Sequence, residues 1–193
     1  RFGLWDEVLA EPDHYPEHMH FTKAFRHAAR AVALAARGDS QAARIEQARY
    51  ARLKGKVPAE TKVGNNTAEA VFAVVDPMVE GEILVREAKV DDGLAALRRA
   101  VAAEDELKYD EPPAWMLPVR HALGANLMTH GRYREAEDVY REDLKRLPSN
   151  GWSLYGLADA LAKQGKQAEH DSVRARFSER SEEHTSELQS PNT

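Results

Sequence analysis

The stretch from Val119 to Pro148, VRHALGANLMTHGRYREAEDVYREDLKRLP, decides the fold because it predicts two amphipathic helices joined by a tight turn. Leu123, Leu127 and Met128 stand at i, i+4 and i+5, which places them on one apolar stripe of a helix. Gly131 ends this helix. A second apolar stripe at helical spacing follows and is closed by Pro148; its members are Tyr133, Ala136, Val139, Tyr140 and Leu144.

The same pattern recurs along the chain in four aligned units. The first helix of each unit carries a small residue, at Ala31, Gly81, Gly124 and Ala158. Leucine follows three residues later, at Leu34, Leu84, Leu127 and Leu161, and the turn comes seven residues after the small residue, at Gly38, Ala88, Gly131 and Gly165. Because a glycine inside a helix costs about 1 kcal/mol relative to alanine, Gly81 and Gly124 predict places where a neighbouring helix passes very close.

Successive units are offset by 50, 43 and 34 residues (31 to 81, 81 to 124, 124 to 158), so the loops between units lengthen toward the N-terminus. Loops are expected at 11–20, 54–66 and 109–113, where proline, glycine and asparagine gather. Pro77 predicts a kink or break in its helix, Asp39 or Ser40 and Asp91 are candidate N-caps, and Pro113 suits a first helical turn. The expected helices are 21–37, 40–53, 67–89, 92–107, 114–130, 133–146, 151–164 and 167–178.

This residue order resembles the tetratricopeptide repeat (TPR), a helix-turn-helix unit of 34 residues. The resemblance rests on Leu123-Gly124 in the first helix, Gly131 at the turn, Ala136 and Tyr140 in the second helix, and Pro148 at its end. It implies an all-α fold, a right-handed α-solenoid of antiparallel helix pairs over residues 1–178. About four helix pairs are expected.

A leading half-repeat is also expected, because Gly3, Trp5 and Val8 are spaced like Gly131, Tyr133 and Ala136. The chain begins at Arg1 rather than Met, so we expect a truncated N-terminus. The polar stretch 180–193, RSEEHTSELQSPNT, loses the apolar period and resembles a translated sequencing-adaptor sequence. Residues 179–193 are therefore expected to be a non-native or disordered tail.

The resemblance also implies a binding groove, since the first helices of TPR pairs line a concave surface that holds a protein or peptide. The positions carried over are Met78, Glu82, His121, Ala125, Tyr155 and Asp159, with Arg86 and Trp152 beside them. Family members that clamp a carboxylate use Lys and Asn at such positions, and this chain departs from that pattern. Aromatic anchoring of a peptide through Trp152, Tyr155 and His121 is the expected alternative; Trp152 and Tyr155 packing only between repeats is the other.

Composition narrows the remaining function classes. The chain carries 27 Lys and Arg against 32 Asp and Glu, a net charge of −5, so it has no basic surplus to hold nucleic acid. It has no cysteine, which excludes disulfides and thiol catalysis. Its apolar runs are far shorter than the about 20 residues that span a bilayer. We expect a cytoplasmic protein with no membrane partner and with weak self-association as a further possibility.

The motifs of catalysis are missing from the sequence: no GxSxG elbow and no glycine-rich phosphate loop occurs. The sequence thus predicts a non-enzymatic protein-interaction scaffold without a cofactor. One alternative is an accessory region of a larger enzyme whose catalytic part lies upstream. Another is metal binding by His14, His18 and His20, which stand among carboxylates; the two prolines between Glu11 and His20 favour a solvated loop without a metal.

Overall fold

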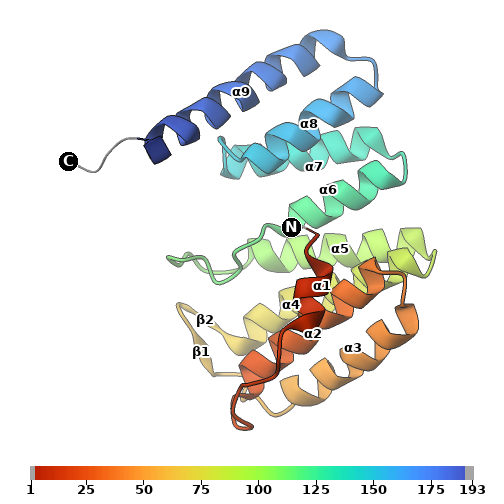
Figure 1. The fold of residues 1–193 in the computed structure, drawn as a ribbon, viewed down its shortest axis with the longest axis vertical. Helices are drawn as coiled ribbons and strands as arrows, with labels where there is room; N and C mark the ends of the chain where they lie inside the picture. The colour runs from red at the N-terminus through yellow and green to blue at the C-terminus, as the bar shows by residue number, and fades with distance from the viewer. Residues whose placement is uncertain (1–2, 190–193) are drawn as a thin grey trace. The chain divides into compact units, whose positions relative to one another are not determined.

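The structure of the protein is a computed structural model that describes residues 3–189. Helices make up almost all of its regular structure, which confirms the all-α prediction (Figure 1). The chain divides into two compact units, residues 1–119 and 120–193, with the boundary at the start of α6. The helices are α1 (Trp5–Ala10), α2 (His20–Ala36), α3 (Ser40–Lys54), α4 (Ala68–Arg86), α5 (Val90–Asp105), α6 (Val119–Thr129), α7 (Tyr133–Arg146), α8 (Gly151–Lys163) and α9 (Gln167–Gln189).

Eight of these helices form the four predicted hairpins, α2/α3 and α4/α5 in the first unit and α6/α7 and α8/α9 in the second. Each hairpin turn has the same hydrogen bonds. The N–H of the residue after the turn position donates to the carbonyl of the leucine that stands four residues before the turn. The pairs are Asp39 to Leu34, Lys89 to Leu84, Arg132 to Leu127 and Lys166 to Leu161, at 2.9–3.0 Å. This bond belongs to the Schellman motif, which needs a left-handed residue at the turn position.

The turn positions have that left-handed conformation in all four hairpins. Their φ angles are +85° at Gly38, +61° at Ala88, +71° at Gly131 and +73° at Gly165. Gly3, two residues before α1, has a φ of +70°, and α7 likewise begins two residues after Gly131. The prediction of turns from the spacing is therefore confirmed, including the one turn that has alanine in place of glycine.

The core of the first unit is built from small residues on α2 and large ones on α4. Ala24, Ala28 and Ala31 are fully or almost fully buried and let α2 lie close to its neighbours. Phe72 of α4 lies among aromatic rings, 5.3 Å from Phe21 between ring centroids. The tilted ring contacts stabilise the packing of α2 on α4 beyond the burial of apolar area.

The predicted close approaches at Gly81 and Gly124 are confirmed. A Cβ atom on Gly81 would lie 2.9 Å from the carbonyl oxygen of Gly93 in α5 and 2.8 Å from Leu97 Cγ. A Cβ on Gly124 would lie 2.5 Å from the Tyr140 ring, and one on Gly156 would overlap the same ring. Tyr140 therefore fills a space between α6 and α8 that only glycine leaves open.

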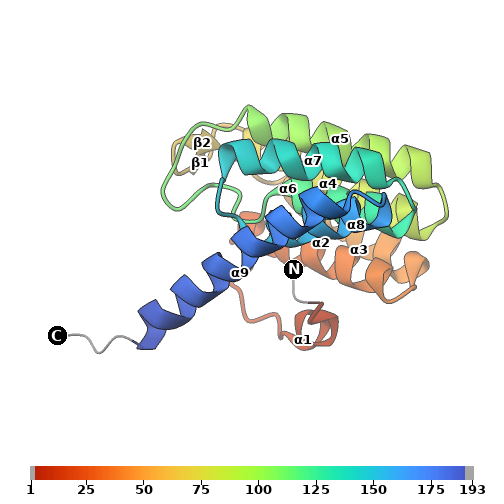
Figure 2. The ribbon, with the colours of Figure 1, turned by 90° about the horizontal axis from the view of Figure 1, so that it is seen from above.

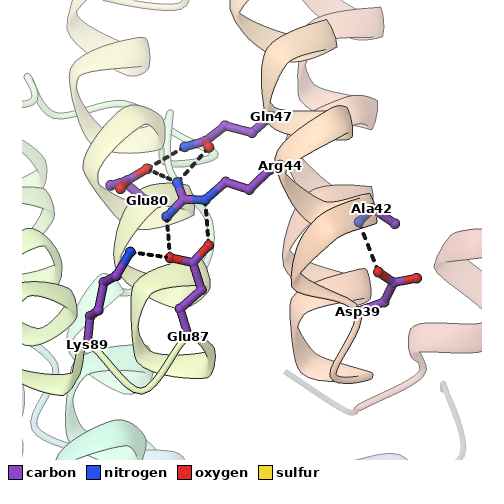
Figure 3. A network of polar contacts seen from close by, with 7 residues as sticks. All are labelled: Asp39, Ala42, Arg44, Gln47, Glu80, Glu87 and Lys89. Carbon is purple, nitrogen blue, oxygen red and sulfur yellow. Dashed lines mark hydrogen bonds and ion pairs between the residues drawn. The ribbon is translucent and has the colours of Figure 1, made fainter.

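An ionic network joins the first two hairpins (Figure 3). Arg44 of α3 donates to both carboxylate oxygens of Glu87, at 2.8 and 2.9 Å, and to Glu80 at 2.5 Å. Gln47 donates to the same Glu80 oxygen at 2.7 Å. The hydrogen bond from Arg44 is the main reason that the pKa of Glu87 is lowered to about 2. The Arg44 guanidinium thus links α3 to Glu80 within α4 and to Glu87, the residue that follows the end of α4.

Two arginines of α2 and Arg37, the residue that follows it, hold the short helix α1. Arg26 and Arg30 donate to the carbonyl oxygens of Glu11 and Leu9 at 2.6 and 2.7 Å, and Arg37 pairs with Asp6. Cations near a helix C-terminus satisfy its free carbonyls and oppose its dipole. These contacts fix α1 on α2 although none of its side chains is fully buried.

Two short strands were not predicted. β1 (Lys62–Val63) and β2 (Asn66–Thr67) pair antiparallel where the sequence predicts a loop. Gly64, with a φ of +58°, occupies the first position of the two-residue turn, as a type II′ hairpin turn requires. The predicted loop at 54–66 and the predicted helix start at residue 67 are thus wrong for these four residues. Within the described residues, no helix has both the length and the apolarity to cross a bilayer.

Several predicted boundaries also change. α4 continues through Pro77 without a break, and Val75 and Val79 on either side of it are buried. α5 begins at Val90, so Asp91 lies in its first turn and does not cap it, whereas Asp39 caps α3 as expected, accepting from the Ala42 N–H at 2.9 Å.

After α5, the next helix, α6, begins at Val119 rather than at residue 114. The N–H of Val119 donates to the Glu104 carboxylate at 3.0 Å. α9 continues to Gln189, past Glu179, where the sequence predicts the start of a tail. The last four residues of that tail, 190–193, lie outside the described residues.

Candidate functional site

The surface of α8 carries three of the predicted groove residues side by side. Trp152, Tyr155 and Asp159 stand at i, i+3 and i+7, so they share one face of the helix, and all three are exposed. Trp152 is 39% and Tyr155 55% exposed, so both aromatic side chains present area to solvent. We refer to these three residues as the α8 surface.

The C-terminal helix borders the α8 surface. The ring of Tyr155 lies 5.9 Å from that of Phe177 in α9, and the guanidinium of Arg174 lies 5.4 Å above the Phe177 ring. Tyr155 therefore packs on α9 with one side and keeps more than half of its area exposed. The interpretation that Tyr155 only packs between helices accounts for the first observation and not for the second.

A buried polar cluster lies beneath the start of α8. Asp143 of α7 is 2% exposed and accepts hydrogen bonds from Ser153 Oγ at 2.6 Å and Asn150 Nδ2 at 3.0 Å. Asn150 also caps α8, accepting from the Trp152 N–H at 3.1 Å. Burial opposes ionisation of Asp143, but the hydrogen bonds from His121 and Ser153 outweigh it, and the pKa of Asp143 is lowered. The cluster thereby fixes the first turn of α8, which carries Trp152.

His121, another predicted groove residue, belongs to this cluster. Its Nε2 lies 2.8 Å from Asn150 Nδ2 and 3.4 Å from Asp143 Oδ2, and its side chain is 18% exposed. His121 therefore joins α6 to the start of α8 and presents only a small part of its ring to a ligand. Ala125, one turn further along α6, is exposed.

The cluster contains serine, histidine and aspartate but lacks the geometry of a catalytic triad. In a triad the imidazole lies between the serine hydroxyl and the carboxylate and accepts the hydroxyl proton. Here Asp143 lies between the other two, and the Ser153 hydroxyl donates directly to it. Ser153 is completely buried, so its oxygen has no access to a substrate. The arrangement supports the position of α8 rather than nucleophilic chemistry.

The predicted groove residues of α4 lie in the first unit. Glu82 is 8% exposed, and Arg86, at i+4, is exposed with its guanidinium 3.8 Å from the Glu82 carboxylate. Met78 is half-buried and packs against the cluster of Val74, Ala100 and Val119. Of these three side chains, Arg86 is the one that offers area to a partner.

The histidine-rich segment before α2 is an irregular loop, as predicted. Lys23 of α2 binds its carboxylates, at 3.4 Å from Asp13 and 2.8 Å from Glu17, and the ring of His14 packs 4.9 Å from that of Tyr15. In the part of the chain that the structure describes, no group of three or more His, Asp or Glu side chains is placed to hold a metal ion. Two carboxylates of this segment, Asp13 and Glu17, are thus engaged by a lysine.

Sequence reasoning missed one exposed group. Tyr109, Met116 and Leu117, in the segment between α5 and α6, are 77%, 72% and 41% exposed. A signal was available, since large apolar residues inside a proline-rich loop cannot all reach a core.

No family model matches the chain, and no curated protein matches it.

Proposed function

We propose that this chain is a non-enzymatic protein-interaction module in which TPR-like hairpins stack as a right-handed solenoid. Its partner would be a protein or peptide held against the first helices of the hairpins. The observation that carries the proposal is the fourfold repetition of one turn geometry, with left-handed residues at Gly38, Ala88, Gly131 and Gly165. Helix pairs with a common turn and an open apolar face gain stability by stacking, and stacked pairs create extended binding surfaces.

The α8 surface is the proposed anchor for the partner. Exposed Trp and Tyr side chains bury large areas on binding and lose little conformational entropy, which makes them frequent hot spots. Asp159 adds a carboxylate on the same face, suited to an amide or a cation of an extended peptide. Arg86 of α4 is the proposed further contact, and the buried Glu82, 3.8 Å from the Arg86 guanidinium, positions it. His121 of α6 acts mainly through the position of α8.

The proposal is tested with peptides selected for binding to the wild-type protein from a random display library. Their affinities are then measured for Tyr155→Ala/Asp159→Lys and for a control, Leu147→Ala/Asp138→Lys. Both variants remove one exposed apolar side chain and reverse one exposed carboxylate, and the control changes lie on α7 and its C-terminal end.

We expect the first variant to weaken binding by about tenfold or more, which corresponds to about 1.4 kcal/mol, and the control to change it by less than twofold. Circular dichroism checks that both variants stay helical. Peptides that bind both variants equally would remove the α8 surface from the proposal, and a library that yields no binder would count against a peptide-binding module.

A further inference from the structure

The connection between α7 and α8 ends in the one Asn-Gly pair of the sequence, Asn150-Gly151. This short connection, residues 147–150, lies at the left of both views in Figures 1 and 2. In an Asn-Gly pair the main-chain nitrogen of the glycine can attack the side-chain amide carbon of the asparagine, because glycine has no side chain to hinder the approach. The pair is therefore a candidate for a chemical change of the asparagine.

Packing does not require glycine at position 151. A Cβ on Gly151 would make an ordinary contact of 3.8 Å with the Phe177 ring, whereas a Cβ on Gly124 or Gly156 would overlap the ring of Tyr140. Alanine also forms helices more readily than glycine. What glycine contributes at this position is therefore an unhindered main-chain nitrogen.

This nitrogen lies outside the hydrogen bonds of the helix. Gly151 is the first residue of α8, and the first N–H groups of an α-helix have no carbonyl partner within it. The carbonyl of Asn150 accepts instead from the Leu154 N–H, at 2.9 Å. Pro148 and Ser149, just before the pair, are exposed, so solvent has access to this part of the chain. The attacking atom and water are thus both present.

Three neighbours hold the side-chain amide of Asn150. Its Oδ1 accepts from the Trp152 N–H at 3.1 Å, and its Nδ2 donates to Asp143 Oδ2 at 3.0 Å. Nδ2 also lies 2.8 Å from His121 Nε2. The amide is therefore held in place until the first turn of α8 opens, and openings at helix ends cost little free energy. The rate of attack should follow the frequency of this opening.

We propose that Asn150 is a site of spontaneous deamidation. The Gly151 nitrogen loses its proton to hydroxide and forms a bond to Asn150 Cγ. The bond from Cγ to Nδ2 then breaks, and Nδ2 takes up a proton from water and leaves as ammonia. A second water opens the resulting succinimide ring at either carbonyl carbon and leaves aspartate or isoaspartate at position 150. One water is consumed and one ammonia released, with no change of oxidation state.

The product disturbs the buried cluster beneath α8. Asp143 is 2% exposed and is held by the hydrogen bond from Ser153 Oγ at 2.6 Å. In aspartate a second carboxylate replaces the Nδ2 donor that lies 3.0 Å from Asp143 Oδ2, and like charges this close repel each other. Isoaspartate also lengthens the main chain at the cap by one methylene group. Either product should loosen the first turn of α8, which carries Trp152.

The site is tested by incubating the full chain at pH 8, where hydroxide promotes the loss of the glycine N–H proton, and following each asparagine by peptide mass spectrometry. Asn65, Asn66 and Asn126, which are followed by Asn, Thr and Leu, serve as internal controls. We expect Asn150 to lose its amide faster than these three residues. Gly151→Ala should abolish most of the reaction while the chain stays folded.

A second variant tests the dependence on opening. Ser153→Ala removes one hydrogen bond from the cluster and should accelerate the deamidation of Asn150. Deamidation of Asn150 that is no faster than at the control asparagines, or that is unchanged in Gly151→Ala, would overturn the proposed site. An unchanged rate in Ser153→Ala would overturn the control of the reaction by opening of the first turn.

The effect on α8 is tested by replacing the product with a substitution. Asn150→Asp introduces the carboxylate, and Asn150→Ser keeps a good neutral N-cap without the amide. At pH 8, above the range in which imidazoles ordinarily carry charge, we expect Asn150→Asp to lower the melting temperature more than Asn150→Ser. Equal melting temperatures would overturn the proposed repulsion. No measurement here involves a binding partner, so failure of these tests is distinct from failure of the proposed function.

Discussion

The α4/α5 pair and the α6/α7/α8 group bring helices together at glycines in two different ways. In α4/α5, Gly81 and Gly93 face each other, and a Cβ on either would lie 2.9 Å from the other's carbonyl oxygen. In α6/α7/α8, Gly124 and Gly156 make room for the ring of Tyr140. The first contact joins two backbones, and the second joins two backbones through a side chain. Gly81 and Gly124 occupy the same position of the repeat, but Gly81 contacts the backbone of Gly93 whereas Gly124 contacts the side chain of Tyr140.

This difference predicts how each contact responds to mutation. A clash with a side chain can be relieved by shortening that side chain, whereas a clash with a backbone atom cannot. The predictions below use this distinction and run from the largest expected effect to the smallest.

Tyr140→Ala should cause the largest loss. The side chain is 6% exposed and contacts both glycines, so its removal leaves a cavity between α6 and α8. We expect the free energy of unfolding to fall by about 3–5 kcal/mol, as for other buried aromatic residues. Urea denaturation followed by circular dichroism measures the loss. Tyr109→Ala, at an exposed position, should change it by less than about 0.5 kcal/mol; similar losses in the two variants would contradict the role of Tyr140.

Gly124→Ala and Gly93→Ala should each cost about 1–3 kcal/mol through overpacking, and a larger residue such as leucine at 124 should cost more. The two variants should then respond differently to a second change. Tyr140→Ala removes the ring that opposes a Cβ at 124 and should abolish most of that cost in a double-mutant cycle.

Val85→Ala should not rescue Gly93→Ala, because the Val85 nitrogen at 2.8 Å and the Gly81 oxygen at 2.9 Å remain. Equal rescue at both sites would show that the two contacts are of one kind.

Ala88→Gly should stabilise the first unit by about 0.5–1 kcal/mol. Ala88 has a φ of +61°, where an L side chain is strained by about 1–2 kcal/mol, and the greater freedom of glycine in the unfolded chain offsets part of the gain. Gly131→Ala, at the equivalent turn of the second unit, should have the opposite sign. Thermal unfolding of both variants gives the comparison, and a destabilised Ala88→Gly would contradict the strain.

The pH dependence of Glu137 should be the smallest effect. Burial alone would raise its pKa, but Lys166, Gln164 and Arg141 hydrogen-bond its carboxylate and lower the pKa to about 2, from an ordinary value of 4.5. A lowered folded-state pKa stabilises the fold above pH 4.5 and loses this contribution as the pH falls toward 2.

Glu137→Gln should remove that part of the acid sensitivity and cost about 1 kcal/mol or less at neutral pH, since Arg141 and Lys166 are partly exposed. Denaturation curves at pH 7, 4 and 3 test this. An unchanged acid sensitivity in Glu137→Gln would exclude the carboxylate as its source.

Much of the fold was predictable because it is set by neighbouring residues. The turns at Gly38 and Gly131 depend on a left-handed residue and on hydrogen bonds within six residues, so spacing alone found them, and even Ala88 was placed correctly. The residues that the glycines contact were not predicted. The need for glycine at 93 and 156 arises only from the neighbouring helices that pack against these positions.

The candidate sites divide in the same way. Exposure of Trp152, Tyr155 and Asp159 follows from helical spacing, whereas the engagement of His121 with Asn150 depends on packing between helices. The β1/β2 hairpin has a local signal, Gly64-Asn65 between two short runs, but the same residues are also typical of an irregular loop. Its contact with Asp110 joins residues too distant in the sequence for any spacing to indicate.

The turn hydrogen bonds have a kinetic consequence. Each hairpin closes through bonds between residues that are neighbours in the chain, and chains dominated by such short-range contacts fold fast. Any of the four hairpins can therefore start to form before distant segments meet. The hydrogen bond from Asn65 to Asp110 requires a much longer loop to close. It should therefore form after α4 and α5 have paired, as one of the last steps of folding in the first unit.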